Sequence, residues 1–396
     1  MFPTEMKFIH TADWQLGKPF AGISDSLKRA HVSRERIEAV RRIGEAAVRE
    51  GASFVLVAGD LFDSLTPERA TVSAACLAVG SIPVPVVVIP GNHDHGGPGS
   101  IWTRPFFLAE RDSLAPNLIV LLEERPYEIE GAVIFPCPLL RRSAVSDPAA
   151  WLRDRQVFNA FGDLRPRILM AHGSIGEFQS LDDDDRVAGI SSSSIDLGRL
   201  DRDAFDYAAL GDWHGTKQVG TKAWYAGTPE QDRFSKGEEN RPGNILLVEA
   251  SRGAVPKVDV LRTSRLGWEA LHYSFSSDSD LELLSGMLDG LFQKEHGRFL
   301  LNLVLEGSLG LEASVRLEQL LQSLEARLLR LKLENRVRTA PGPVEIEALT
   351  GNASDPLTAR VAGRLAGMAA GEGDEAQLAA LALRELHGLF ILEGGR

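Results

Sequence analysis

Five short apolar runs in this sequence each end in side chains that can bind a metal ion. The residues at these ends are Asp13, Gln15, Asp60, Asn92, His93, His172, Asp212 and His214. A single Asp or His in such a place is as often a cap or a hydrogen-bonded loop residue. Five such ends, all with nitrogen or oxygen donors and none with Cys, indicate one shared site.

The apolar runs have the composition of buried strands, because they are short, rich in Val and Ile, and bounded by Gly, Pro or Asp. They cover residues 7–10, 54–58, 86–89, 118–122, 133–135, 168–171, 207–210 and 245–248. Between the first two, apolar residues recur at helical spacing from Ile37 to Ala47, and Gly51 is placed to end that helix. Thr66 and Pro67 predict a second helix start, as N-cap and first helical residue. Alternating strands and helices predict a layered α/β fold, in which strand ends meet along one ligand-binding edge.

The residue types at this edge indicate the chemistry. Asp, Asn and His without Cys suit hard or borderline divalent cations, Mn²⁺ or Mg²⁺ first and Fe²⁺ or Zn²⁺ next. Two such ions about 4 Å apart generate hydroxide at neutral pH and hold a phosphoryl group for in-line attack. The sequence therefore predicts phosphoester hydrolysis.

The order and flanks of these motifs resemble the calcineurin-like metallophosphoesterase superfamily. Residues 10–13, 58–63 and 90–94, with 225–230 and 246–249, are similar to the SbcD family of DNA-repair nucleases over roughly residues 7–250. The resemblance implies a layered β-sandwich core flanked by helices, followed by a small α+β capping domain and C-terminal helices. It also implies two divalent ions, with Mn²⁺ preferred and Mg²⁺ or Fe²⁺ as alternatives.

Carried over residue by residue, the resemblance assigns each site residue a role. The first ion would be bound by Asp13, Gln15, Asp60 and His214, and the second by Asp60, Asn92, His172 and Asp212. His93 would be catalytic, stabilising the transition state or protonating the leaving oxygen. Asp94 is expected to orient His93 or a helix terminus.

Two residues depart from the family pattern, because Gln15 and Asp212 stand where the family has histidines. Gln offers a neutral carbonyl oxygen, a weaker donor than imidazole toward most transition metals. Asp212 adds a negative charge, which favours harder ions. These changes predict either a retuned site or a weakened one that serves as a scaffold for DNA or an ATPase.

The 396-residue chain is acidic, with a net formal charge of −12 and two Cys. This charge argues against coating nucleic acid by non-specific attraction alone. Two Cys are too few for a disulfide framework, which indicates a reducing compartment. No apolar run reaches the ~20 residues of a spanning helix, and the first strand begins too early for a signal peptide, so we expect a cytoplasmic protein without membrane contact.

Beyond about residue 265 the pattern changes. Strands are predicted at 271–275, 299–305 and 336–338, and helices at 281–292, 315–331, 356–370 and 374–388. The expected domains are a nuclease domain over residues 1–265, a capping domain over 266–343 and a helical partner-docking region over 344–396.

By the same resemblance, the substrate is DNA, and the partners are a second copy of the chain and an SbcC-like coiled-coil ATPase that docks on the helices beyond residue 355. Arginines could form a phosphate-binding face or be ordinary solvated residues; they are Arg34, Arg36, Arg41, Arg42, Arg141, Arg142, Arg165 and Arg167. The acidic run Asp182–Asp185 predicts an exposed loop or a flap near the site. A phosphodiesterase for small or cyclic nucleotides is the alternative function, which the large C-terminal region disfavours.

Overall fold

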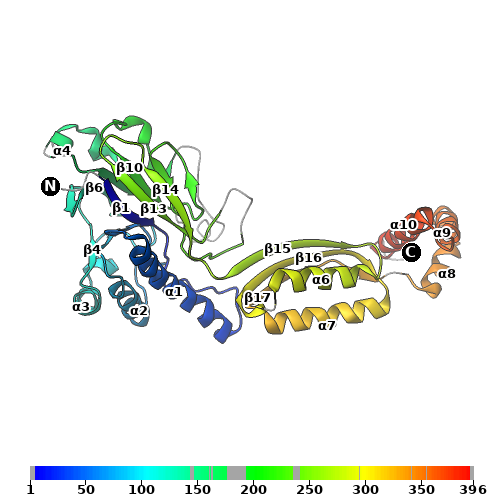
Figure 1. The fold of residues 1–396 in the computed structure, drawn as a ribbon. Coiled ribbons are helices and arrows are strands. Elements are labelled where there is room, and N and C mark those ends of the chain that lie inside the picture. Colours follow the sequence, from blue (N-terminus) through cyan, green and yellow to red (C-terminus); the bar gives the residue numbers. More distant parts are fainter. Residues whose placement is uncertain are drawn as a thin grey trace. The chain divides into compact units, whose positions relative to one another are not determined.

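The computed structural model describes residues 5–142, 147–159, 161, 164–175, 193–234, 241–293, 295–339, 341–353 and 355–392. Residue contacts divide the chain into two compact units, Met1–Leu266 and Gly267–Arg396, drawn in Figure 1. The predicted run Asp182–Asp185 lies outside the described residues. The predicted further division of the second unit near residue 343 stays a prediction.

The first unit contains two six-stranded sheets. The first has the order β14 (Lys257–Arg262), β13 (Asn244–Ser251), β1 (Glu5–Thr11), β2 (Val55–Ala58), β3 (Val86–Ile89) and β4 (Leu118–Val120). Strands β1 to β4 are parallel, and β13 returns antiparallel to β1. The second has the order β11 (Lys217–Gln218), β12 (Ala223–Tyr225), β10 (Tyr207–Gly211), β7 (Arg167–His172), β6 (Ala132–Cys137) and β5 (Tyr127–Ile129). Two short strands, β8 (Ser174–Ile175) and β9 (Ser194–Ile195), pair beside it.

The two sheets stack through their apolar faces, as predicted for a layered sandwich. Phe8 and Phe54 of the first sheet stack with ring centroids 5.0 Å apart, and Tyr207 of the second meets Phe8 edge-on. Ile134 and Met170 belong to the same buried cluster. All eight strands predicted before residue 250 are present, because strands buried on both faces are continuous apolar runs. The strands β5, β8, β9, β11, β12 and β14 were not predicted.

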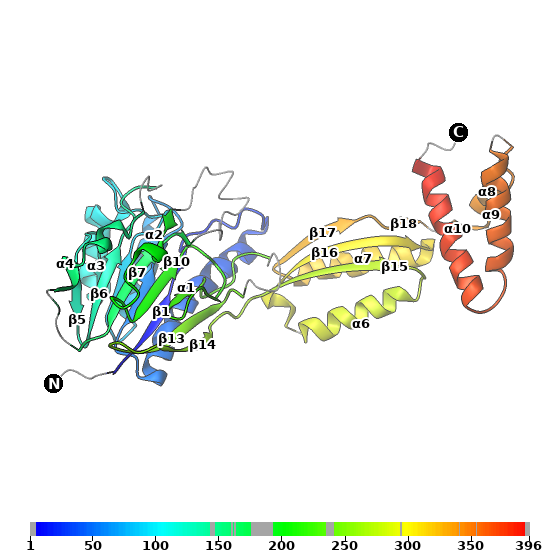
Figure 2. The ribbon, with the colours of Figure 1, turned by 90° about the horizontal axis from the view of Figure 1, so that it is seen from above.

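Helices cover the outer faces of both sheets (Figure 2). Helices α1 (Ser26–Glu50), α2 (Arg69–Gly80) and α3 (Pro105–Leu114), with the 3₁₀ turn η1 (Ile101–Thr103), lie on the first sheet. The shorter η2 (Ala150–Arg153), α4 (Gln156–Asn159) and η3 (Leu197–Arg199) lie on the second. Gly51 ends α1 in the left-handed conformation, as predicted. The predicted start of α2 is wrong by two residues, because Glu68 is the N-cap and Pro67 lies in the preceding loop, where its restricted φ fits equally well.

The second unit begins with a parallel sheet of β15 (Gly267–Phe275), β16 (Phe299–Leu309), β17 (Arg330–Asn335) and β18 (Arg338–Thr339). Its core joins this sheet to α6 (Asp280–Phe292) and α7 (Leu311–Arg327). The 3₁₀ turn η4 (His296–Arg298) connects α6 to β16 in the chain. The predicted helix 315–331 runs too far, because Leu331 belongs to β17. The predicted strand 336–338 is also wrong, since β17 ends at Asn335 and β18 begins at Arg338.

The described part of the chain ends with three helices: α8 (Pro343–Thr350), α9 (Pro356–Ala369) and α10 (Asp374–Leu392). The last two were predicted, whereas α8 falls where a Pro-rich linker was expected, because Pro343 opens the helix instead of interrupting it. Leu349, Ala362 and Leu383 form their small core. Among the described residues, no helix is both long and apolar enough to cross a bilayer.

Candidate metal centre

The carboxyl ends of strands from both sheets carry the predicted ligands. Asp13 follows β1, Asp60 follows β2 and Asn92 follows β3 in the first sheet, while His172 ends β7 and Asp212 follows β10 in the second. All five side chains are buried, and Asp13 and His172 have no solvent exposure. The fold therefore brings together residues that are up to 199 positions apart in the chain.

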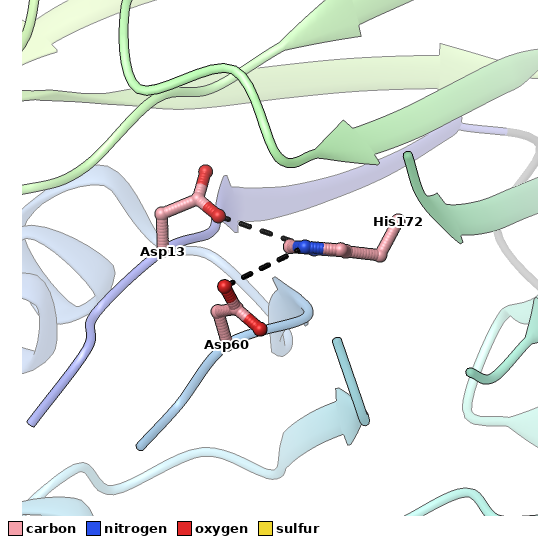
Figure 3. A group of neighbouring side chains, drawn as sticks. All are labelled: Asp13, Asp60 and His172. Atoms are coloured by element: carbon pink, nitrogen blue, oxygen red, sulfur yellow. Dashed lines mark ion pairs between the residues drawn. The ribbon is translucent and has the colours of Figure 1, made fainter. Parts of the chain in front are cut away.

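Asp13, Asp60 and His172 form the tightest group, shown in Figure 3 with both carboxylates directed at the imidazole. One ligand atom from each lies within 4.8 Å of the others. Asp60 Oδ2 is 3.6 Å from His172 Nε2, and Asp13 Oδ1 is 3.9 Å from Nδ1. Both separations are too long for direct hydrogen bonds, and the space between Asp60 and Nε2 can admit a cation.

The ring of His172 is oriented for metal binding. Its Nδ1 lies 2.8 Å from the Ala58 carbonyl, so Nδ1–H donates there and the lone pair is left on Nε2. That lone pair faces Asn92 Oδ1 at 3.2 Å and Asp212 Oδ1 at 3.7 Å. A proton on Nε2 or a cation must therefore lie between these acceptors. The donor set fits a divalent ion.

The backbone is strained where the ligands lie. Asp13, Gln15, Asp60 and Asp212 have φ of 53°, 40°, 54° and 98°, in the region that residues other than Gly rarely adopt. Each such residue costs about 1–3 kcal/mol and persists only where the surrounding structure holds it. Such strain concentrates at functional sites.

Electrostatic interactions also favour a cation at this position. Burial raises the pKa of Asp13 to about 6. His214 and His172 oppose this shift, whereas Asp60 and Asp212 reinforce it. Burial lowers the pKa of His172, but Asp60, Asp13 and Asp212 outweigh it, so the net shift is upward. Buried carboxylates raise one another's pKa because their charges repel. A bound divalent cation would relieve this repulsion.

Glycines allow the strand ends to approach closely. A Cβ at Gly91 would lie 2.1 Å from Asp60 Oδ1 and 2.6 Å from the Asp60 nitrogen. A Cβ at Gly59 would lie 2.1 Å from His172 Nδ1, and the φ of Gly59 is +95°. Both positions therefore require glycine for Asp60 and His172 to keep their places.

Gly91→Ala is expected to lower the free energy of unfolding by about 1–3 kcal/mol, because the added methyl group overpacks a rigid site. It should also weaken Mn²⁺ binding, since Asp60 is the group that must move. Urea unfolding and a Mn²⁺ titration would measure the two effects. Gly286→Ala is the control: its methyl group meets no atom within 4 Å in α6, so about 0.5–1 kcal/mol of stabilisation is expected. Equal unfolding energies and Mn²⁺ affinities for Gly91→Ala and the unmodified protein would contradict the close-approach argument.

Asp94 has a different task from the one predicted. Its carboxylate accepts hydrogen bonds from the Gly91 nitrogen at 2.8 Å and the Phe62 nitrogen at 3.0 Å. Burial, followed by repulsion from Asp60, raises its pKa to about 7. Asp94 thus joins the loops after β2 and β3. Among the described contacts of its carboxylate, none is with the His93 side chain or a helix terminus.

His93 lies at the edge of this group. Its backbone nitrogen donates to Asp60 Oδ1 at 3.0 Å, and its Nδ1 donates to the Asp63 carbonyl at 2.9 Å. Nε2 is then directed toward the centre, 3.9 Å from Asp60 Oδ2. The side chain is 9% exposed, so it reaches both the centre and solvent.

Gln15 and His214 lie side by side, with Gln15 Nε2 3.4 Å from His214 Nε2, but both have other partners. Gln15 Oε1 accepts from Lys18 Nζ at 3.0 Å. His214 Nδ1 is 2.7 Å from Arg233 Nη2 and 3.3 Å from Asp232 Oδ2. None of these three partners was predicted from the sequence. Only Lys18, three residues after Gln15, had a positional signal.

One arginine of the predicted phosphate-binding face is part of the scaffold instead. Arg36 is buried, and its guanidinium donates to the carbonyls of Asp13 at 3.1 Å, Trp14 at 3.0 Å and Glu230 at 2.9 Å. It lies on the inner face of α1 and holds the loop that carries Asp13. Arg42 likewise pairs with Glu230, at 2.6 Å.

Two further arginines of that set are also engaged. Arg165 pairs with Glu128 at 2.8 Å, and Arg167 donates to the Phe158 carbonyl at 3.3 Å. Four others, Arg34, Arg41, Arg141 and Arg142, are exposed. The arginines available to a substrate are therefore fewer than the sequence pattern indicates.

Comparison with known proteins agrees with this geometry. The family profile described as calcineurin-like phosphoesterase matches residues 6–216. The uncharacterized metallophosphoesterase YhaO of Bacillus subtilis (strain 168) is 26% identical over 299 residues, which cover 74% of this chain and 68% of the relative. The D component of the SbcCD nuclease of Staphylococcus epidermidis is 23% identical over 266 residues, or 62% of this chain and 66% of the relative.

Among solved structures, TT1561 of Thermus thermophilus is 12% identical with a TM-score of 0.39, covering 65% of this chain and 99% of that one. The family profile spans more than half of the 396 residues and includes every predicted site residue. This chain therefore belongs to the calcineurin-like phosphoesterase family, whose members are metal-dependent phosphoester hydrolases.

Proposed function

We propose that this protein is a metal-dependent nuclease that hydrolyses phosphodiester bonds of DNA. The observation that carries the proposal is an open cavity of about 950 Å³ between α1, α2 and the loops after β1 and β2. The cavity borders the candidate centre through two of its lining residues. Lys18 contacts Gln15, and Asp63 contacts His93. The cavity is open and its lining extends along α1 from Ser26 to Arg41, which suits an extended polymer better than a single nucleotide.

The cavity wall formed by α1 is basic. Arg29, Arg34 and Arg41 line it, and Arg34 is exposed. Acidic residues line it as well, and one of them, Glu38, is paired with Arg41. A few cations in one groove fit a substrate whose backbone is held at several phosphates. The acidic net charge of the chain does not conflict with such a local site.

The chemistry follows from the residues at the centre. A bound divalent ion supplies the Lewis acid that activates water and the phosphoryl group. Asp13, Asp60 and Asp212 provide the carboxylate oxygens, and His172 provides Nε2. As the P–O ester bond breaks, His93 Nε2 gives a proton to the leaving oxygen. The oxygen-rich donor set makes Mn²⁺ the preferred ion, ahead of Mg²⁺ or Fe²⁺.

The proposed partners are a second copy of the chain and an SbcC-like coiled-coil ATPase. One relative is named as the D component of the SbcCD nuclease, which is an assembly. The helices α8 to α10 expose large apolar side chains, with Val344 74%, Leu357 69% and Leu378 67% exposed. We propose these helices as the docking site of the ATPase, and their exposed apolar side chains support this choice.

The test is cleavage of end-labelled single- and double-stranded DNA in Mn²⁺, Mg²⁺ or EDTA, beside bis(p-nitrophenyl) phosphate and a cyclic nucleotide. DNA cleavage that requires Mn²⁺ and disappears in EDTA is expected. Hydrolysis of the cyclic nucleotide at rates far above those on DNA would replace the nuclease proposal with a small-nucleotide phosphodiesterase. Hydrolysis of bis(p-nitrophenyl) phosphate alone, with or without a coiled-coil ATPase, would reject DNA as the substrate.

Arg34→Glu is expected to raise the KM for DNA about tenfold at low salt and to leave the KM for bis(p-nitrophenyl) phosphate unchanged. One lost phosphate contact weakens DNA binding and reduces its salt dependence by about one counterion. Steady-state kinetics at several salt concentrations would measure both values. The control is Arg125→Glu, because Arg125 pairs with Glu123 on the surface and is 75% exposed. An equal effect of the two substitutions would rule out the cavity as the DNA site.

A further inference from the structure

We propose that the centre binds a single divalent ion, and that Lys18 and Arg233 supply positive charge on the side where the family pattern predicts a second ion. This inference rests on the phosphodiesterase function proposed above. It concerns the number of ions, so it can fail while that function stands.

The side that fits an ion contains His172. Its Nε2 faces oxygens of Asp60, Asp212 and Asn92 at 3.6, 3.7 and 3.2 Å. Asp13 completes the group, and its Oδ1 accepts from the Asp212 nitrogen at 3.1 Å. Three carboxylates and one imidazole can satisfy the coordination and the charge of one divalent ion.

The side of Gln15 and His214 does not fit a second ion. The Gln15 amide oxygen, the only atom by which Gln15 could bind a metal, is occupied by the Lys18 ammonium at 3.0 Å. His214 has the Arg233 guanidinium 2.7 Å from Nδ1 and 3.5 Å from Nε2. A divalent ion there would meet two cations, so the donors and the local charge both disfavour it.

Both cations are held in place by a buried carboxylate. Asp232 Oδ2 is 2.9 Å from Lys18 Nζ and 2.9 Å from Arg233 Nη2. Burial raises the pKa of Asp232, but Lys18 and His214 outweigh it, so the carboxylate stays ionised. Burial, followed by repulsion from Arg36, lowers the pKa of Arg233 to about 10, which leaves the guanidinium charged at neutral pH. Lys18 and Arg233 carry two positive charges and Asp232 carries one negative charge, so one positive charge remains in excess.

This arrangement explains both departures from the family pattern. Gln15 replaces a histidine where the neighbour is an ammonium, and an amide oxygen accepts a hydrogen bond from Lys18. Asp212 replaces a histidine on the opposite side, where a third carboxylate strengthens binding of the remaining ion. In a phosphodiesterase, Lys18 and Arg233 would donate hydrogen bonds to the non-bridging oxygens as charge develops there.

The experiment is a count of Mn²⁺ bound to the full chain, by equilibrium dialysis and elemental analysis, with electron paramagnetic resonance of the loaded protein. One Mn²⁺ per chain with the six-line spectrum of an isolated ion is expected. Two ions per chain with the spectrum of an exchange-coupled pair would overturn the proposal. Neither readout depends on DNA cleavage, so the outcome is independent of whether DNA is the substrate.

A triple variant, Gln15→His with Lys18→Met and Arg233→Met, is expected to bind a second ion, because it restores an imidazole and removes both cations. The matched control is Lys332→Met with Arg364→Met, two exposed residues of the second unit, which should still bind one ion. Circular dichroism would show that both proteins are folded. A folded triple variant that still binds one ion would contradict the role given to the cations.

Lys18→Met alone is expected to lower kcat on bis(p-nitrophenyl) phosphate by about 10²-fold, as for the loss of one donor to the developing charge. Lys18→Arg should restore part of this loss, since it keeps the charge. A purely structural Lys18 would lower the melting temperature and leave kcat of the folded fraction unchanged, which would refute this part of the proposal.

Discussion

Asp60→Asn is expected to reduce phosphodiesterase activity by at least about a thousandfold, because loss of Lewis-acid catalysis removes several kcal/mol of transition-state stabilisation. Asp60 faces His172 Nε2 across 3.6 Å and also accepts from the His93 nitrogen at 3.0 Å. Asn keeps the shape but removes the negative charge that the ion requires. Mn²⁺ affinity should therefore fall with activity. Hydrolysis of bis(p-nitrophenyl) phosphate and a Mn²⁺ titration would measure the two effects.

The control for this substitution is Asp112→Asn, which removes a carboxylate that is 67% exposed and paired with Arg111. It should change neither activity nor Mn²⁺ affinity. Thermal unfolding in EDTA separates a metal effect from a folding defect, since the ion contributes nothing there. If Asp60→Asn kept full activity at limiting Mn²⁺, Asp60 would not be a ligand.

His93→Gln is expected to lower kcat by about 10²–10⁴-fold, the usual contribution of a positioned acid, while Mn²⁺ affinity stays unchanged. The geometry predicts this separation, because His93 Nδ1 is used by the Asp63 carbonyl and Nε2 lies 3.9 Å from Asp60. Substrates with a good leaving group need less protonation. The loss should therefore be smaller on bis(p-nitrophenyl) phosphate than on DNA.

His95→Gln is the control, because His95 is two residues away and only its Nδ1 has a described contact, with the Gly97 nitrogen at 3.3 Å. Activity should stay within about twofold of the unmodified protein, since no interaction with the reacting groups is lost. Loss of Mn²⁺ binding in His93→Gln would instead make His93 a metal ligand. Equal losses on the two substrates would exclude proton donation to the leaving oxygen.

Much of the fold could be predicted because the information is local. Buried parallel strands are continuous apolar runs, and the ligands follow their carboxyl ends directly. Asp13, Asp60, Asn92, His172 and Asp212 therefore converge as the order of strands indicates. The helix 315–331 was extended too far, because the leucines of β17 continue the apolar spacing of α7 and no Gly or Pro marks the boundary.

Contacts between distant polar residues could not be predicted. Lys18 and Arg233 meet at Asp232 across more than 200 positions, and no spacing rule connects them. Arg36 is different, because a signal was present: it falls four residues after Val32 and four before Val40, on the buried face of α1. Composition suggested a phosphate-binding arginine there, whereas periodicity indicated the core.

The order of the strands in space has a consequence for how the enzyme is made. Strands β1 to β4 are synthesised first, the whole second sheet follows, and only then does β13 return to pair with β1. Asp13, Asp60 and Asn92 come from the early segment, whereas His172 and Asp212 come from the later one. A partly synthesised chain therefore lacks His172 and Asp212 and cannot hydrolyse a phosphoester. A divalent ion bound by residues of both sheets would link them, so metal binding and sheet docking would stabilise each other.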